Sequence, residues 1–437
     1  MELQKNPKFN QSKMAQHRKI LPKITNVVVQ YHTIALTNIM ITYIFLLLFL
    51  FLLDLSMATT WKLNLLDPTL YPRAQCLDGS QGGYYVNPSK STSSSLYIHH
   101  EGGGWCQTQT KDGKETWPND NCQDRALGSL GSTVNATQTY DFSTNSMGCA
   151  GCSEDPVANP LMHDWNKVLI LYCDGTSFSS SNDDRIDGLH FNGLDILNAV
   201  QDDLSNKIFT DLSEVVIGGS SAGGLAVYLH LDWWAEKLAS VNPAMKVVGL
   251  PDGGFFLDYT VAATSNYSYD ADLRQGFNDF NCKSGVNQLC VASKIANNQP
   301  VSDCYFAEHT LPFITTPIFI FQTVFDSWQL QWENGMADPI DYNALNAYGA
   351  SLENSMQTAI ESNQNNVVGG FIDRCFHHCT TDELLGTTPV ILGRTMAQGF
   401  ASFWLDPLQT MVIWQHDAPL PCEDCDCPAG MDGPAKR

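Results

Sequence analysis

Two serines among glycines, in the segment "GGSSAGG" at 218–224, have the type and spacing needed for nucleophilic chemistry. Ser221 fits the pattern Gly-x-Ser-x-Gly, in which a strand enters and a helix leaves through a tight turn that exposes the serine hydroxyl. The same turn directs the N–H of Ala222 and a helix N-terminus toward the place where an oxyanion would form. Ser220 is the rival nucleophile, although the second residue after it is Ala222 rather than glycine.

A serine becomes a good nucleophile only when a histidine, itself oriented by a carboxylate, takes its proton. Asp326 follows the apolar run "PIFIFQT", and His377 and His378 lie later, in "CFHHC". This is the chain order Ser, Asp, His of α/β-hydrolases. Asp252, in "LPDGGFFLD", is the alternative acid. The pattern predicts an acyl-transfer enzyme, with serine protease activity as a weaker alternative.

A second glycine-rich segment, "EGGGWC" at 101–106, follows the short strand-like run "LYIH". It is close to the His-Gly-Gly-Gly type of loop found in esterases. Three consecutive glycines let the backbone approach a substrate carbonyl and point N–H groups at it. This loop supports the acyl-transfer hypothesis independently of the serine turn.

Short β-rich runs alternate with helical runs, which predicts an α/β fold with a mostly parallel sheet flanked by helices, of the α/β-hydrolase type. We expect one domain over 59–437, with lid-like insertions and a cysteine-rich C-terminal extension from about 419 to 437. The expected strands are 96–99, 167–173, 214–218, 246–250 and 317–323, and the expected helices are 193–204, 222–238, 342–362 and 394–405.

Seven segments, in this order, resemble the pectin acetylesterase/Notum family over roughly Thr60 to Cys427. The resemblance implies a secreted serine carboxylesterase of α/β-hydrolase fold. Such an enzyme removes acyl groups from polysaccharides or, in Notum, from a lipid-modified protein. The segments are "EGGGWC", "YCDGTSFSS", "GLHFNG", "GGSSAGGLA", "PDGGFFLD", "FDSWQ" and "CFHHC".

Matched residue by residue, the resemblance implies Ser221 as nucleophile, Asp326 as acid and His378 as base. Two positions depart from the family pattern: Ser220 stands where plant members usually carry cysteine, and His377 adjoins the base. The serine route requires no metal and no organic cofactor. The implied oxyanion hole is Gly103, Gly104 and Ala222, and the expected substrate pocket includes Trp105, Ser220, Trp328 and His377.

The N-terminal segment 1–58 is expected to target the chain to the secretory pathway. Its stretch 34–53 is apolar, uncharged and long enough for a bilayer, and the basic residues before it favour a cytoplasmic N-terminus. Cleavage after Ala58 and retention as a type II signal anchor are both consistent with "SMATTW". Asn135 and Asn266 lie in glycosylation sequons beyond this segment.

All fourteen cysteines lie beyond the apolar stretch, which predicts disulfides formed in an oxidising compartment. Closely spaced cysteines can also bind zinc, so zinc is the alternative for three groups. Those groups are Cys149/Cys152, Cys375/Cys379 and Cys422/Cys425/Cys427.

The charge of the chain limits its partners. Six of the 24 basic and two of the 46 acidic residues lie in 1–58, so 59–437 holds 18 basic and 44 acidic residues, a formal charge of −26. Such a field repels nucleic acid and polyanions. The resemblance implies removal of acetyl groups from a polysaccharide, and the charge favours a neutral acylated glycan, or pectin at acidic pH, as that polysaccharide. We also expect the protein to be a monomer. The alternatives are a Notum-like deacylase for a longer acyl chain and an inactive hydrolase-fold binding protein.

Overall fold

The structure is a computed structural model of the 437-residue chain. The expected apolar span 34–53 and the sequon at Asn266 lie outside the residues that it describes. No helix among the described residues is long and apolar enough to cross a membrane. The structure describes residues 60–89, 91, 93–106, 121–142, 148–207, 212–259, 269–332, 340–407, 412–415, 419–422 and 425–434.

A ten-stranded sheet runs through the centre of this part of the chain, in the order β10-β9-β8-β7-β6-β3-β5-β2-β1-β4. The strands from β10 to β5 are parallel, whereas β2, β1 and β4 continue the sheet in antiparallel pairing. The strands are β1 (Thr60–Leu65), β2 (Gly83–Asn87), β3 (Ser95–His100), β4 (Thr139–Asp141), β5 (Asn166–Ile170), β6 (Glu214–Ser220), β7 (Lys246–Asp252), β8 (Ile318–Thr323), β9 (Val368–Asp373) and β10 (Val412–Trp414).

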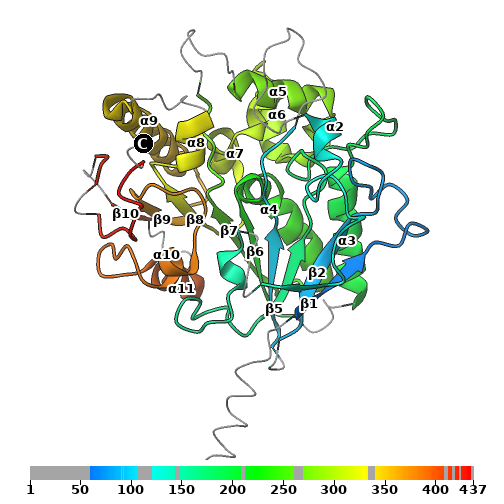
Figure 1. Ribbon diagram of the computed structural model, residues 1–437, viewed down its shortest axis with the longest axis horizontal. Coiled ribbons are helices and arrows are strands. Elements are labelled where there is room, and N and C mark those ends of the chain that lie inside the picture. Colours follow the sequence, from blue (N-terminus) through cyan, green and yellow to red (C-terminus); the bar gives the residue numbers. More distant parts are fainter. Residues whose placement is uncertain are drawn as a thin grey trace, which may run out of the picture. The chain divides into compact units, whose positions relative to one another are not determined.

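Helices cover both faces of this sheet (Figure 1). Successive residues of β6 belong to different cores: Val215 and Ile217 pack into the cluster shared with α3, α4 and α9, and Val216 packs into the cluster shared with α11. The longer helices are α3 (Gly193–Lys207), α4 (Ala222–Val241), α5 (Tyr269–Asp279), α6 (Gln288–Ala296), α9 (Tyr342–Glu361) and α11 (Met396–Leu405). The shorter ones are α2 (Cys122–Arg125), α7 (Ala307–Thr310), α8 (Ser327–Trp332), α10 (Asp382–Gly386), η1 (Ala150–Cys152), η3 (Cys282–Gly285), η4 (Val301–Tyr305) and η5 (Leu311–Phe313).

The predicted α/β fold with a mostly parallel sheet is confirmed, and each expected strand and helix is present within a few residues of its expected bounds. Sequence reasoning missed β9, whose "VGGFID" contains two glycines that weaken a strand signal. Packing explains one of them, because a Cβ on Gly369 would lie 2.6 Å from the ring of Phe403 and 2.7 Å from that of Phe319.

Disulfides account for twelve of the cysteines, as the sequence predicts. Cys375 pairs with Cys427 rather than with the nearby Cys379, and Cys379 and Cys282 are unpaired. The zinc alternative is wrong for the closely spaced cysteines, because Cys149/Cys152 and Cys422/Cys425/Cys427 are all in disulfides and Cys379 has lost its neighbour Cys375 to one. The bonds are Cys76–Cys173, Cys106–Cys122, Cys149–Cys152, Cys290–Cys304, Cys375–Cys427 and Cys422–Cys425.

Candidate active site

Ser221 occupies a sharp turn between β6 and α4. Its φ of 59° and ψ of −126° are unusual for a residue with a side chain, and such strain is typical of functional turns. The glycines on either side are sterically required. A Cβ on Gly219 would lie 2.2 Å from the carbonyl oxygen of Gly223, and a Cβ on Gly223 would lie 2.1 Å from that of His100. The turn predicted from the glycine spacing is therefore present.

A chain of hydrogen bonds joins Ser221, His378 and Asp326. His378 Nε2 lies 2.8 Å from Ser221 Oγ, and His378 Nδ1 lies 2.8 and 2.9 Å from the two carboxylate oxygens of Asp326. Asp326 follows β8 and His378 follows β9, so parallel strands deliver all three side chains to the same edge of the sheet. In the neutral histidine, Nδ1–H donates to the carboxylate and Nε2 is left to accept the serine proton.

The electrostatic interaction between His378 and Asp326 makes His378 a stronger base. Burial opposes the charged imidazolium, but the negative charge of Asp326 and contacts with Cys379 outweigh it and raise the pKa of His378 well above 6.5. Burial also opposes ionisation of Asp326, yet the charge and hydrogen bond of His378 dominate and lower the pKa of that carboxyl. Asp326 is fully buried, whereas the His378 side chain is 18% exposed and so accessible to a substrate.

Asp252, the alternative acid, has other partners. Its carboxylate accepts hydrogen bonds from the backbone N–H and the hydroxyl of Thr380 and from the hydroxyl of Ser220. Ser220 also donates to the carbonyl of Gly148 at 2.5 Å, so its hydroxyl is engaged behind the turn. Within the described residues, neither Asp252 nor Ser220 joins the hydrogen-bond chain of Ser221 and His378.

The loop after β3 brings its glycines beside Ser221. Gly103 and Gly104 adopt φ values of 139° and 67°, which a residue with a side chain rarely adopts. Among the described residues, their N–H groups donate to no protein acceptor, whereas both carbonyls are held: Arg125 donates to Gly103 and Tyr172 to Gly104, each at 2.7 Å. A Cβ on Gly104 would have no heavy atom within 4 Å, so this part of the loop faces open space rather than the core.

Gly102 offers a direct test of the loop's position. A Cβ at this position would lie 2.2 Å from the Ser220 carbonyl oxygen and 3.0 Å from Ser221 Cβ, so Gly102→Ala must displace the loop from the nucleophile. We expect kcat for nitrophenyl acetate to fall roughly 100-fold or more, because a misplaced oxyanion donor costs about that much. Steady-state kinetics measures kcat, and thermal denaturation checks that the variant is folded. The control is Gly128→Ala, whose Cβ makes only a 3.7 Å contact, and equal kcat values for the two variants would contradict the assignment.

Aromatic rings surround the histidine side of the site. Trp328 stacks on His378 at a centroid distance of 5.9 Å and an interplanar angle of 25°, and Phe256 lies 6.0 Å from the same imidazole. Trp105 meets Phe256 edge-on at 4.8 Å, with Tyr269 6.1 Å from the Trp105 ring. Trp105 and Phe256 are almost fully buried. The space beside the base is therefore filled by packed rings.

His377, the other expected pocket residue, is held behind the base. Its Nε2 lies 3.1 Å from both carboxylate oxygens of the buried Asp373. Burial opposes its charge, but Asp373 outweighs this and raises the pKa of His377. The structure thus does not bring His377 into the hydrogen-bond chain of Ser221. Trp328 does stack on His378, and Trp105 contacts Trp328 at a centroid distance of 6.0 Å.

Sequence reasoning missed several residues that support the site. Glu101 accepts the backbone N–H of Tyr172, and burial raises the pKa of Glu101 to about 7. Arg125 holds the Gly103 carbonyl, and Phe256 packs against His378. Glu101 and Phe256 stand in the quoted motifs "EGGGWC" and "PDGGFFLD", so the motifs were the available signal, but their contacts depend on distant segments.

One cluster has the side chains of a metal site, formed by Asp258, Asp303 and His309. Cations of the protein already occupy it. Arg274 bridges the two carboxylates, and Lys294 Nζ lies 2.8 Å from Asp303. The cluster therefore serves as an ion network that ties α5 and α6 to the loop carrying Phe256.

The strained serine turn, the ordered side chains at one edge of a parallel sheet and the glycine loop define the α/β-hydrolase class. Comparison with known proteins is more specific. A model of the family described as Pectinacetylesterase matches residues 55–427, and the chain belongs to this family. It is a carboxylic ester hydrolase.

Relatives and solved structures agree with this assignment. Pectin acetylesterase 5 of Arabidopsis thaliana is 33% identical over 384 residues, covering 83% of this chain and 83% of that protein. The palmitoleoyl-protein carboxylesterase NOTUM of Schmidtea mediterranea is 30% identical over 267 residues, which cover 59% of this chain and 47% of that protein. A crystal structure of the Wnt deacylase Notum from Drosophila shares the fold, with a TM-score of 0.68 at 23% identity over 84% of this chain and 99% of that one.

Proposed function

We propose that the protein removes acetyl groups from a polysaccharide through an acyl-Ser221 intermediate. The observation that carries the proposal is the hydrogen-bond chain from Asp326 through His378 to Ser221. His378 takes the serine proton as Oγ attacks the acyl carbonyl, and backbone N–H groups of Gly104 and Ala222 stabilise the oxyanion. The sugar hydroxyl leaves with the proton from His378. A water molecule, deprotonated by the same imidazole, then hydrolyses the acyl-serine to acetate.

The packing beside His378 favours a short acyl group. Trp105 and Phe256 are 6% and 1% exposed and touch edge-on, so these rings leave little room for a long chain on this side. Pectin acetylesterases 5 and 4 match 83% of this chain, whereas the Notum relatives match 59 to 69% of it, and the chain spans about half the length of the Notum proteins that it matches. Both observations favour acetate over a fatty acyl group.

The test is hydrolysis of nitrophenyl esters of increasing chain length by the secreted protein. We expect the highest kcat/KM with acetate and a decline toward octanoate and palmitate. Release of acetate from acetylated xylan and from acetylated pectin then identifies the polymer. A preference for the long chains would instead place the protein with the protein deacylases, and no hydrolysis of any ester would refute the proposal.

The pH dependence follows from the sign of the His378 shift. A protonated imidazole cannot accept the serine proton, and Asp326 raises the pKa of His378 above 6.5. We therefore expect kcat/KM for nitrophenyl acetate to rise with pH through an apparent pKa above 6.5. The same pairing contributes folding stability that is fully present below pH 6.5 and is lost as pH rises through the folded pKa. If the acid limb of the kcat/KM profile had its midpoint below pH 6.5, this expectation would be contradicted.

Activity at neutral pH bears on the polymer. Pectin is a polyanion there, and the described domain belongs to a chain with a formal charge of −22, so an acetylated neutral glycan suits the site better. The disulfides are consistent with the secretory pathway, and the sequon residue Asn135 is exposed. We propose a monomer that is secreted or anchored through its N-terminal segment. N-terminal sequencing of the mature protein tests cleavage after Ala58.

A further inference from the structure

A second cavity, of about 550 Å³, lies between the later turns of α4 and the segment that leads into α6. We call it the α4–α6 cavity. It shares no residue with the serine, acid, base or glycine loop, and its volume is within the range of ligand-binding pockets. Its lining includes His230, Asp232, Trp233, Ala239, Asn287 and Leu289.

Hydrogen bonds hold the wall of the α4–α6 cavity in place. Asp232 Oδ1 accepts from the N–H and the hydroxyl of Thr316 at 2.9 and 2.7 Å, and both of its oxygens accept from Thr315. Asp232 Oδ2 also accepts from the amide of Asn287 at 3.2 Å. One carboxylate thus joins three segments of the chain, and a wall fixed in advance lowers the cost of binding.

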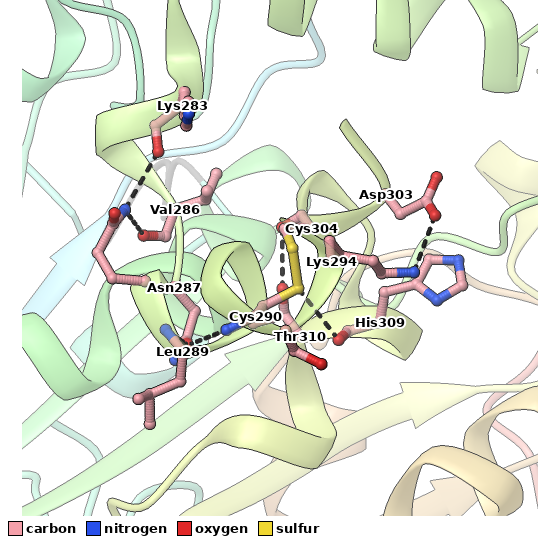
Figure 2. Close-up of a disulfide and its surroundings, with 12 residues drawn as sticks. Lys283, Val286, Asn287, Leu289, Cys290, Lys294, Asp303, Cys304, His309 and Thr310 are labelled. Atoms are coloured by element: carbon pink, nitrogen blue, oxygen red, sulfur yellow. Dashed lines mark hydrogen bonds and ion pairs between the residues drawn. A yellow bond between two sulfur atoms is a disulfide. The ribbon is translucent and has the colours of Figure 1, made fainter. Parts of the chain in front are cut away.

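A disulfide fixes the opposite rim. Asn287 Oδ1 accepts from the N–H groups of Leu289 and Cys290, so this residue caps α6. Cys290 is bonded to Cys304 in η4, as Figure 2 shows beside Asn287 and Leu289. Leu289 is 54% exposed, so the rim offers an apolar surface that does not depend on movement of α6.

The lining determines which ligands fit. Among the described residues, the charged side chains that line the cavity are the acids Asp232 and Glu236, which disfavours an anionic ligand, although Lys237 Nζ lies 5.9 Å over the ring of Trp233. The Asp232 carboxylate is already saturated by donors from the protein. Trp233 contributes a partly buried indole, with amide and hydroxyl groups around it. An aromatic ring beside neutral polar groups suits the apolar ring face and the hydroxyl groups of a sugar.

His230 supplies an acceptor at the buried side of the cavity. It is 2% exposed, and burial lowers the pKa of its imidazole to about 3, so the ring is neutral. Its Nε2–H donates to the carbonyl of Ser177 at 3.1 Å, which leaves Nδ1 as an acceptor without a partner among the described residues. The Ser177 hydroxyl in turn donates to the carbonyl of Ala222 and accepts from Trp105 Nε1, each at 2.8 Å. Ser177 thus contacts the cavity wall and the catalytic turn.

We propose that the α4–α6 cavity is a non-catalytic binding site for a neutral polysaccharide segment. The rise of α4 places Trp233 about 18 Å along the helix axis from Ser221, so a sugar bound here lies outside the catalytic site. The choice of a glycan rests on the proposed function, because a polymeric substrate gives an esterase a use for a second contact. Holding the polymer at two places raises the effective concentration of its acetyl groups at Ser221.

The test is binding of an unacetylated xylan hexasaccharide to the full secreted protein, measured by calorimetry. We expect Trp233→Ala to weaken binding at least tenfold and Trp233→Phe to weaken it less. Ala239→Arg, at the exposed edge of α4, fills the mouth without touching the core and should also weaken binding. Glu236→Gln removes one negative charge at the rim of the cavity. Its matched control is Glu361→Gln on α9, which removes the same charge outside the cavity and should bind the hexasaccharide like the native chain.

Three outcomes would overturn the proposal: no binding to the native chain, equal affinity in the native, Trp233→Ala and Ala239→Arg proteins, or tighter binding of the polyamine spermidine than of the sugar. Thermal denaturation of each variant separates loss of the site from loss of the fold. Because the hexasaccharide carries no ester, its binding can be read even if nitrophenyl acetate is not hydrolysed. Failure of the glycan site and failure of the proposed esterase function are therefore distinguishable.

Discussion

Replacing Ser221 with alanine is expected to lower kcat for nitrophenyl acetate by about a million-fold, because the acyl intermediate can no longer form. The fold should be unaffected. Ser221 makes no side-chain cap for α4, and its strained φ of 59° is as unusual for alanine as for serine. Steady-state kinetics together with a thermal denaturation curve measures both quantities.

Ser220→Ala is the matched control, since it removes the same hydroxyl one residue earlier. Its hydroxyl binds the Gly148 carbonyl and Asp252, so the change should cost about 1 kcal/mol of folding free energy and leave most of kcat intact. If Ser220→Ala abolished turnover while Ser221→Ala retained it, the two serines would have to exchange roles. The strained turn would then need another explanation.

The second large effect is expected at Asp326. An asparagine at this position cannot accept from His378 Nδ1–H in the same way, so the imidazole is held in the wrong tautomer and its Nε2 no longer accepts the serine proton. We expect Asp326→Asn to lower kcat by about ten-thousand-fold with a small change in KM. It should also move the acid limb of the pH profile to lower pH, because the charge of Asp326 is the largest contribution that raises the pKa of His378.

Asp252→Asn distinguishes the two candidate acids. Asp252 accepts from Thr380 and Ser220 and does not contact His378, so its replacement should reduce the free energy of unfolding by about 1 to 3 kcal/mol. The value of kcat for nitrophenyl acetate should stay close to that of the native protein. A larger loss of kcat in Asp252→Asn than in Asp326→Asn would show that the acid has been assigned to the wrong strand.

Local sequence was informative wherever sterics act between neighbours along the chain. The glycines around Ser221 could be interpreted correctly because the turn itself leaves no room for a Cβ at Gly219 or Gly223. The buried parallel strands were recognisable as apolar runs for a similar reason, since both of their faces are covered. The strand β9 was not predicted because its Gly369 is required by packing against the rings of Phe403 and Phe319, which come from other elements.

Distance along the chain made other features unpredictable. Cys375 lies four residues from Cys379 but pairs with Cys427, because the fold brings the C-terminal segment beside β9. The order of β2, β1 and β4 at the antiparallel edge depends on pairings that no short pattern encodes. Phe256 is an apolar residue in a glycine-rich motif, and only packing shows that it touches the His378 ring.

The amino-acid sequence by itself determined the nucleophile turn, the chain order of serine, acid and base, and the family, because each is carried by residues in local contact or by ordered motifs. The tertiary structure decided that Asp326 rather than Asp252 contacts His378. It also decided that Ser220 bonds to Asp252 and His377 to Asp373, so neither residue joins the hydrogen-bond chain of Ser221. These choices depend on side chains from separate strands meeting at one edge of the sheet. The register of those strands, set by pairing across the whole sheet, is what brings Asp326 within 2.8 Å of His378.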